Sequence, residues 1–570
     1  MTAQDAAGSQ GWAQAAIDDA GALDLLLADA ALGALRRFRP DSSLLRFGFA
    51  LARRPGLVGR QAALLGAELG KIAAGRSEIA PGARDRRFAD PAWSGNPLLR
   101  RVVQAYLAGG GAAEALLAGA GLGWRDETRL RFLLTNLVAA AAPSNNPLLS
   151  PLAWKALIDT GGGSVLRGVQ ALVSDLAAPP RVPSMVPPDA FEVGRDLAVT
   201  PGGVVHSCEQ FELIQYRPVT EAVYRHPVLI VPPMINKYYI VDLAPGRSMA
   251  EFLTGQGHQV FVMSWRNPDA RHRDWGLDSY GRAMTEALAA ARAITGSDKV
   301  NACGLCSGGI LAAMVAAHLG RTGRLGELAG LCLGVTVLDQ QGAGTAGAMI
   351  DEVTAAAATA VSAARGYLDG RALAEVFAWL RPDDLIWNYW VNNYLQGRPP
   401  PAFDILHWNA DTTRLPAALH RDFISLALAN ALTKPGAARL LGSPVDLSEV
   451  DTDAYVIAGI ADHLCPWQSC YRSTQLLGGP VKFVLSTSGH IAAMVNPPGN
   501  PKASFRTAPS NPADPAGFLS AAETVAGSWW PDYSSWLAAR GGGQKRSPDG
   551  LGGAGYPLRG AAPGTYVHDR

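Results

Sequence analysis

One cysteine lies where nucleophilic catalysis would need it. Cys306 occupies the run Gly304-Leu305-Cys306-Ser307-Gly308, between a predicted strand at 300–305 and a helical pattern at 310–319. This is the G-x-S-x-G nucleophile elbow with cysteine in place of serine, and glycines flank it because the nucleophile occupies a sharp, strained turn. The same turn directs the Ser307 N–H at a developing oxyanion. The motif alone is weak evidence, and its strand–turn–helix context strengthens it.

An acid and a histidine follow in the order that the elbow requires. Asp462 comes after a predicted strand at 455–460, and His490 comes after another at 482–485. In a catalytic triad of this kind, the nucleophile, the acid and the histidine follow one another in this order along the chain. The acid and the histidine each lie on a loop after a late strand. The sequence therefore predicts Cys306 as nucleophile, His490 as general base and Asp462 as its partner. His463 is a candidate second proton carrier, although a loop histidine is more often a hydrogen-bonding partner.

The cysteines permit other interpretations. Free cysteine is among the most buried residue types, so Cys306 taken alone could be structural. Cys303 and Cys306 form C-x-x-C, and Cys465 and Cys470 form C-x4-C, but no second C-x-x-C completes a zinc site. We expect neither metal nor cofactor. Six irregularly spaced cysteines in 570 residues predict no disulfide framework and favour the reducing cytoplasm.

The elements that must position these residues change along the chain. Residues 1–190 read as mainly helical, and strand patterns begin afterwards, alternating with helices as in a parallel sheet covered on both faces. Residues 191–540 are therefore predicted as an α/β-hydrolase domain. Its helical, aromatic-rich stretch at about 339–453 is predicted as an inserted cap or lid, and residues 541–570 as an irregular tail.

Composition excludes several functions. Lys and Arg total 50 against 49 Asp and Glu, and charged residues make up 17% of the chain. With a net charge of +1, the protein has no overall positive electrostatic potential that would bind nucleic acid. Hydrophobic residues make up 48%. No uninterrupted apolar run reaches the roughly 18–20 residues of a transmembrane span, and the first residues show no secretory signal.

With these motifs together, the chain resembles the polyhydroxyalkanoate synthases, which polymerise 3-hydroxyacyl-CoA thioesters into storage polyester. The resemblance spans most of the chain. It is carried by the segments Arg87–Trp93, Pro143–Pro147, Val231–Tyr239, Ser264–Pro268, Cys306–Gly309, Asp383–Trp390, Trp408–Pro416, Asp462–His463, Ser488–Ile491, Asn496–Asn500 and Pro563–His568.

The resemblance implies the same three catalytic positions, Cys306, Asp462 and His490, and a second oxyanion N–H from the Met234–Ile235 loop. The single-subunit, pseudomonad type called class II is the most similar, which implies medium-chain (R)-3-hydroxyacyl-CoA as substrate, with release of CoA. The resemblance also implies a homodimer that lies in the cytoplasm at the surface of polyester granules. It implies that the enzyme holds the growing polyester chain.

Two alternatives stay open. A cysteine-type α/β-hydrolase acting as thioesterase or depolymerase would share the elbow and the triad but release free hydroxy acid. A non-enzymatic granule-coating protein would use the apolar surface alone and would have no need of the triad.

Overall fold

The computed structural model describes residues 27, 30–33, 42–83, 85–340, 352–462, 464–553 and 555–570. The chain divides into two compact units. The sheet unit comprises Met1–Leu32, Asp189–Gly370 and Phe403–Arg570, and the helical unit comprises Gly33–Pro188 and Arg371–Ala402. Among the described helices, none has both the length and the apolar character that crossing a membrane requires.

An eleven-stranded sheet organises the sheet unit, in the order β15-β14-β13-β12-β7-β6-β4-β5-β2-β1-β17. Its centre, from β13 to β5, is parallel, and antiparallel strands extend both edges. The strands are β1 (Gly202–Ser207), β2 (Phe211–Tyr216), β4 (Val228–Val231), β5 (Val260–Trp265), β6 (Val300–Leu305), β7 (Leu328–Gly334), β12 (Ala454–Gly459), β13 (Val481–Ser486), β14 (Ser504–Thr507), β15 (Glu523–Ala526) and β17 (Gly560–Ala561).

The central strands form where the sequence has short, continuous apolar runs. Every residue of β4, β5, β6 and β12 is buried, as expected for parallel strands covered on both faces. The predicted α/β-hydrolase architecture is confirmed. Strand β7, next to β6, starts at Leu328 and ends at Gly334, and six of its seven residues are buried.

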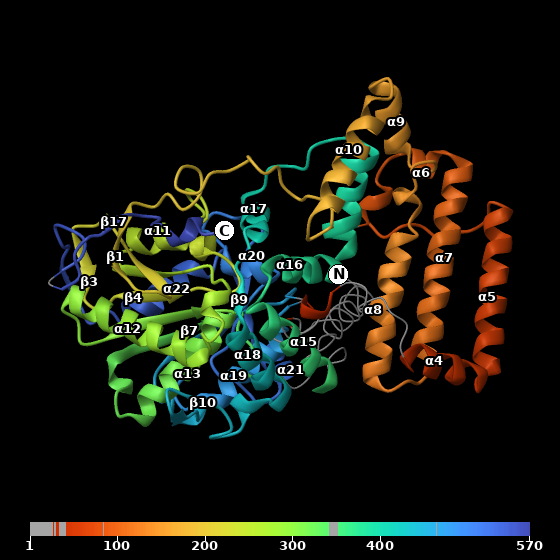
Figure 1. The fold of residues 1–570 in the computed structure, drawn as a ribbon. Coiled ribbons are helices and arrows are strands. Elements are labelled where there is room, and N and C mark those ends of the chain that lie inside the picture. Colours follow the sequence, from red (N-terminus) through yellow and green to blue (C-terminus); the bar gives the residue numbers. More distant parts are fainter. Residues whose placement is uncertain are drawn as a thin grey trace. The chain divides into compact units, whose positions relative to one another are not determined.

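Helices connect and flank these strands, with α11, α12, α13 and α22 around the sheet in Figure 1. The helices of the sheet unit are α11 (Met249–Gly255), α12 (Leu277–Thr295), α13 (Ser307–Arg321), α15 (Glu352–Arg365), α17 (Asp404–Ala410), α18 (Ala417–Ala429), α19 (Trp467–Leu476), α20 (His490–Met494), α21 (Pro515–Ala521) and α22 (Trp530–Ala538). Short strand pairs join β3 (Ala222–Tyr224) to β16 (Gln544–Arg546), β8 (Tyr367–Leu368) to β9 (Leu415–Pro416), and β10 (Arg439–Leu440) to β11 (Ser443–Pro444).

The tail at 541–570 contains only short regular elements and is anchored to the sheet unit. It supplies β16 and β17, and the latter pairs with β1. The buried Glu212 carboxylate on β2 accepts hydrogen bonds from the Thr565 and Tyr566 N–H groups and from the Thr565 hydroxyl, over 2.7–3.0 Å. Short strands of this kind carry little hydrophobic periodicity, which is why the sequence did not reveal them.

The helical unit contains α4 (Ser42–Ala52), α5 (Pro55–Ala73), α6 (Ala92–Gly95), α7 (Pro97–Gly119), α8 (Trp124–Ala140), α9 (Pro151–Asp159), α10 (Gly163–Ala177) and most of α16 (Gly370–Leu380). Pro55 separates α4 from α5 because proline cannot donate the backbone hydrogen bond that a continuing helix needs.

Within the stretch predicted as a cap at 339–453, the segment Arg371–Ala402 clusters with the helical unit and the other described residues cluster with the sheet unit. Two π-helical stretches, Asp383–Trp387 and Trp390–Leu395, carry its aromatic side chains. The Trp390 indole N–H donates to the Asn145 carbonyl over 3.1 Å, and the Tyr394 hydroxyl donates to Asp175 over 2.7 Å. The aromatic residues expected in a cap thus pack on helices that precede them by more than 200 positions in the chain.

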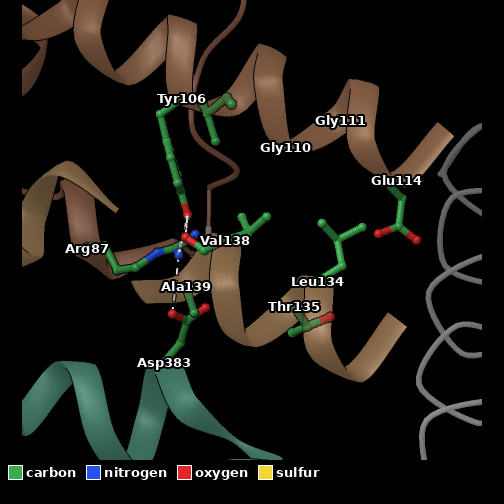
Figure 2. A pocket seen from close by; sticks show the side chains of 11 residues that line it. Arg87, Tyr106, Gly110, Gly111, Glu114, Leu134, Thr135, Val138, Ala139 and Asp383 are labelled. Atoms are coloured by element: carbon green, nitrogen blue, oxygen red, sulfur yellow. Dashed lines mark hydrogen bonds and ion pairs between the residues drawn. The ribbon is translucent and has the colours of Figure 1, made fainter. Parts of the chain in front are cut away.

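A small pocket of about 330 Å³ lies within the helical unit, between α7, α8 and Asp383 (Figure 2). Arg87 donates there to Asp383 over 3.2 Å and to the Tyr106 hydroxyl over 3.1 Å. These contacts also tie the 371–402 segment to the helices. The predicted catalytic residues do not line this pocket.

Candidate active site

Strand β6 delivers Cys306 to a strained turn. Cys306 has φ 53° and ψ −122°, a backbone conformation that residues other than glycine rarely adopt. Helix α13 starts at the next residue, and the Cys306 N–H donates to the Gly334 carbonyl at the end of β7 over 2.8 Å. The geometry is that of a nucleophile elbow.

The glycines around Cys306 are required by close backbone contacts. A Cβ atom on Gly308 would lie 2.3 Å from the Val231 carbonyl oxygen and 2.6 Å from that of Pro232. A Cβ atom on Gly304 would lie 2.6 Å from the Gly309 Cα. Both glycines let the elbow approach its neighbours at a distance that no side chain would permit.

Asp462 and His490 meet at the ends of neighbouring strands. Asp462 lies in the loop after β12, and His490 is the first residue of α20, after β13. The His490 Nδ1–H donates to Asp462 Oδ2 over 2.7 Å. Asp462 Oδ1 accepts the N–H groups of Leu464 and Cys465, both over 2.9 Å. These bonds fix the carboxylate and orient the ring, so that Nε2 of His490 points away from Asp462.

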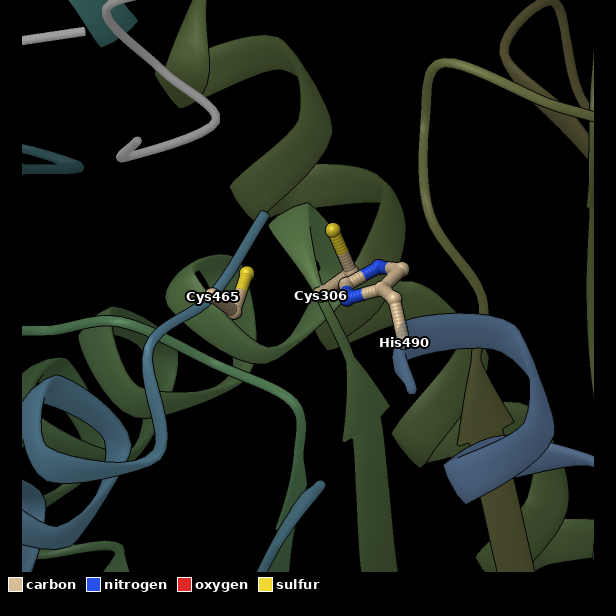
Figure 3. A group of neighbouring side chains, drawn as sticks. All are labelled: Cys306, Cys465 and His490. Atoms are coloured by element: carbon tan, nitrogen blue, oxygen red, sulfur yellow. The ribbon is translucent and has the colours of Figure 1, made fainter. Parts of the chain in front are cut away.

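A second thiol shares this site. The sulfurs of Cys306 and Cys465 and a ring nitrogen of His490 all lie within 4.8 Å of one another, and all three residues are buried. Figure 3 shows Cys306 between the other two side chains. Two sulfurs and one imidazole are also a set that Zn²⁺ accepts, so the expected absence of a metal stays a prediction.

The electrostatics favour a thiolate on Cys306. Hydrogen bonds from Cys465 and then His490 outweigh burial and lower the pKa of Cys306 to about 6. Burial would lower the pKa of His490, but the Asp462 charge and hydrogen bond, together with Cys306, raise it to about 10. The hydrogen bond to Cys306 and burial raise the pKa of Cys465 well above its ordinary value. Near neutral pH the site holds a thiolate, an imidazolium and a neutral thiol.

The predicted oxyanion residues lie beside the elbow. Met234 and Ile235 follow β4, and the Met234 N–H donates to the Ser307 hydroxyl over 3.0 Å. Thr413 holds the same loop from the other side, donating its hydroxyl to the Met234 carbonyl over 2.9 Å and its N–H to the Ile235 carbonyl over 3.2 Å. The Ser307 N–H contributes to the lowered pKa of Cys306.

The remaining cysteines and His463 contribute differently. Cys303 lies opposite Cys332 in the β6–β7 ladder, so the C-x-x-C motif sends its two thiols into different environments. Cys470 is buried on α19. His463 lies outside the residues that the structure describes.

Sequence reasoning weighed Cys465 only as half of a C-x4-C metal motif and missed its place beside Cys306. The available signal was its position three residues after Asp462, on the loop that must reach the triad. That signal is weak because spacing along a loop does not fix the direction of a side chain.

Comparison with known proteins places the chain among polyester polymerases. Residues 84–253 match the family described as "Poly-beta-hydroxybutyrate polymerase (PhaC) N-terminus", and residues 227–497 match the alpha/beta hydrolase fold. Poly(3-hydroxyalkanoate) polymerase 1 of Ectopseudomonas oleovorans is 46% identical over 91% of this chain and 92% of its own length.

Two further relatives are similar over most of their length. Polymerase 2 of the same organism is 47% identical over 89% of this chain and 90% of that protein. The poly(3-hydroxyalkanoate) polymerase subunit of Cupriavidus necator is 39% identical over 87% of this chain and 85% of that protein. At this identity and coverage, the chain belongs to the poly(3-hydroxyalkanoate) polymerase family.

Proposed function

We propose that this protein polymerises (R)-3-hydroxyacyl-CoA into polyhydroxyalkanoate through a covalent acyl thioester on Cys306. The observation that carries the proposal is the buried Cys306–His490–Asp462 arrangement at a nucleophile elbow, in a chain of this family. No cofactor takes part in the reaction we propose.

In the first half-reaction the Cys306 thiolate attacks the carbonyl carbon of the acyl-CoA thioester. The N–H groups of Ser307 and Ile235 stabilise the resulting oxyanion, since the Met234 N–H already donates to the Ser307 hydroxyl. Collapse of the tetrahedral intermediate expels CoA, and the His490 imidazolium protonates its sulfur. An acyl-Cys306 thioester and a neutral His490 remain.

In the second half-reaction neutral His490 removes the proton from the 3-hydroxyl of another acyl group. The alkoxide attacks the acyl-Cys306 carbonyl, an oxoester forms, and the Cys306 thiolate leaves. Asp462 keeps the His490 ring in the tautomer with a free Nε2 and stabilises its charge. The cysteine suits this sequence because its thioester lies close in energy to CoA thioesters, whereas transfer to an alcohol is downhill.

Substituting Cys306 with alanine tests the assignment. With 3-hydroxyacyl-CoA as substrate, C306A is expected to release no CoA above background and to form no polymer. Cys303→Ala is the matched control, since Cys303 is equally buried three residues earlier but lies beside Cys332. Full CoA release by C306A would refute the role of Cys306.

The product separates polymerase from the hydrolytic alternatives. A thioesterase or depolymerase with the same triad would give free 3-hydroxy acid, because water instead of a hydroxyacyl group would attack acyl-Cys306. Chain extraction and mass analysis of the product distinguish the outcomes, and we expect polyester. A granule-coating protein without activity would release no CoA at all.

We propose medium-chain acyl groups as the preferred substrates, on the strength of the similarity to the pseudomonad polymerases. Separate incubations with 3-hydroxybutyryl-CoA and 3-hydroxyoctanoyl-CoA test this preference. A single methylene changes selectivity by only about 1–3 kcal/mol, so the two chain lengths are chosen four carbons apart. A higher kcat/KM for the shorter substrate would contradict the proposal.

We also propose that the enzyme works as a homodimer in the cytoplasm, at the surface of polyester granules. Most exposed large hydrophobic side chains of the described residues lie on the helical unit, including Leu45, Phe49, Leu148, Ile158 and Leu166, each at least 67% exposed. Such surfaces mark contact with apolar partners. Granule co-sedimentation of wild type against L45E/F49E/L166E tests the granule association, and sedimentation velocity tests the homodimer.

His463, on the loop after Asp462 in the sequence, stays a candidate auxiliary residue.

A further inference from the structure

The Cys465 thiol lies beside the proposed nucleophile but has no part in the reaction described above. Its backbone N–H supports Asp462, whereas its side chain is 2% exposed and approaches Cys306 and His490 within 4.8 Å. The Cys465 thiol is also the main cause of the lowered pKa of Cys306. A thiolate with a neutral thiol beside it is the arrangement that turns one oxidised cysteine into a disulfide.

We propose that Cys465 is a resolving cysteine, which converts a hydroperoxide-oxidised Cys306 into a reversible Cys306–Cys465 disulfide. The site would respond to small hydroperoxides such as hydrogen peroxide. This inference goes beyond the proposed polymerase activity, since it depends only on the two sulfurs and their surroundings.

The chemistry balances in two steps. The Cys306 thiolate attacks one peroxide oxygen, the O–O bond breaks, and Cys306 becomes a sulfenic acid while the peroxide is reduced by two electrons. The other oxygen leaves as hydroxide, and the His490 imidazolium protonates it to water. The Cys465 thiol then attacks the Cys306 sulfur: the S–S bond forms, the S–OH bond breaks, and a second water leaves.

The fold allows the two sulfurs to approach. Cys465 lies in the loop between β12 and α19, and Cys306 lies at the end of β6, one strand removed from β12 in the sheet. A disulfide bond of about 2.05 Å requires the sulfurs to close from their present separation. In the proposed disulfide the loop that carries Cys465 moves toward Cys306, because the elbow is packed closely at Gly308 against the Val231 and Pro232 carbonyls.

The disulfide would have two consequences. It would remove the nucleophile, so the oxidised enzyme would release no CoA. It would also trap Cys306 before Cys306 is oxidised to sulfinic acid. Thiol reductants reverse the disulfide but not the sulfinic acid. The pair therefore protects the catalytic sulfur under oxidative conditions and restores activity on reduction.

The test treats the reduced full-length protein with hydrogen peroxide, with EDTA present throughout because the same three side chains could bind Zn²⁺. Activity is measured before and after dithiothreitol, relative to each variant's reduced activity, and non-reduced peptides are mapped by mass spectrometry. Wild type, Cys465→Ser and Cys465→Val are compared with Cys470→Ser. Cys470 is the matched control because it is equally buried on the following helix.

We expect wild type and C470S to lose activity, to show a Cys306–Cys465 cross-linked peptide and to recover with dithiothreitol. Both Cys465 variants should instead accumulate Cys306 sulfinic acid and recover less activity with dithiothreitol than wild type does. Inactivated wild type without the cross-linked peptide, or equal recovery in the Cys465 variants, would overturn the proposal. Because peptide mapping needs no turnover, a failure of the polymerase assignment would be seen separately, as inactivity of the reduced protein.

Discussion

Replacing Asp462 with asparagine should disable Cys306 without disturbing the fold around it. The Asp462 side chain is fully buried and accepts His490 Nδ1–H over 2.7 Å and two backbone N–H groups over 2.9 Å. Asparagine has the same shape, and its oxygen can still accept the backbone groups. Its NH₂ group would then face His490 and force the ring into the tautomer with the proton on Nε2, which cannot accept a proton from Cys306.

The size of the effect follows from the pKa of Cys306. With a pKa of about 6, roughly nine-tenths of Cys306 is thiolate at neutral pH. Loss of the imidazolium leaves the hydrogen bond from Cys465 in place, so a return of the Cys306 pKa to its ordinary 9.0, with a thiolate fraction of about one-hundredth, is the upper limit of the change. Thiolate reactivity should therefore fall by up to about 100-fold. CoA release should fall further, toward about 10⁴-fold, because the second half-reaction also loses its base.

The assay is the rate of Cys306 alkylation by iodoacetamide as a function of pH, followed by peptide mass spectrometry. The thiolate is present above its pKa and is lost as pH falls through it, so wild type should show a midpoint near 6. In D462N the midpoint should move up, by at most about 3 pH units because Cys465 still lowers the pKa of Cys306. Asp451→Asn, at an exposed aspartate before β12, is the control and should keep the wild-type profile. An unchanged midpoint in D462N would refute the reasoning.

Three further predictions follow from the same contacts. The rate of enzyme acylation should be flat between about pH 6 and 10 and should fall below pH 6 as Cys306 becomes protonated; a single-turnover pH profile that keeps falling from pH 8 to 7 would contradict this. Gly308→Ala should lower the free energy of unfolding by about 1–3 kcal/mol and reduce CoA release, because its Cβ would lie 2.3 Å from the Val231 oxygen; Gly326→Ala, where nothing lies within 4 Å, is the control in denaturant melts. Glu212→Gln should lower the free energy of unfolding by about 1.5–3 kcal/mol by weakening the charge-assisted bonds to Thr565 and Tyr566, whereas the exposed Glu209→Gln should have no effect in the same melts.

Much of the fold could be predicted from the sequence because its signal is local. Strand β6 is a short apolar run followed by glycines and a helical pattern, and these features all lie within about twenty residues of Cys306. The same holds for the strands that precede Asp462 and His490, which end close to the predicted positions. The order of the three residues along the chain then predicted which of them should meet.

The insertion and the tail could not be predicted in the same way. The aromatic residues of 383–395 read as part of a cap, but Trp390 bonds to Asn145 and Tyr394 to Asp175. The tail has little apolar periodicity, and its strand β17 forms because β1 presents an open edge. In both cases the partner is far away in sequence, and no local pattern records it.

The sequence by itself determined the fold class, the elbow and the three residues of the candidate triad, because glycine spacing and strand–helix alternation act on neighbouring residues. Only the tertiary structure decided the protonation of the site. The low pKa of Cys306 depends on Cys465 and His490, which are 159 and 184 positions away in the chain and reach it through separate loops. Electrostatic interactions inside a protein depend on distances in space, and folding alone sets those distances.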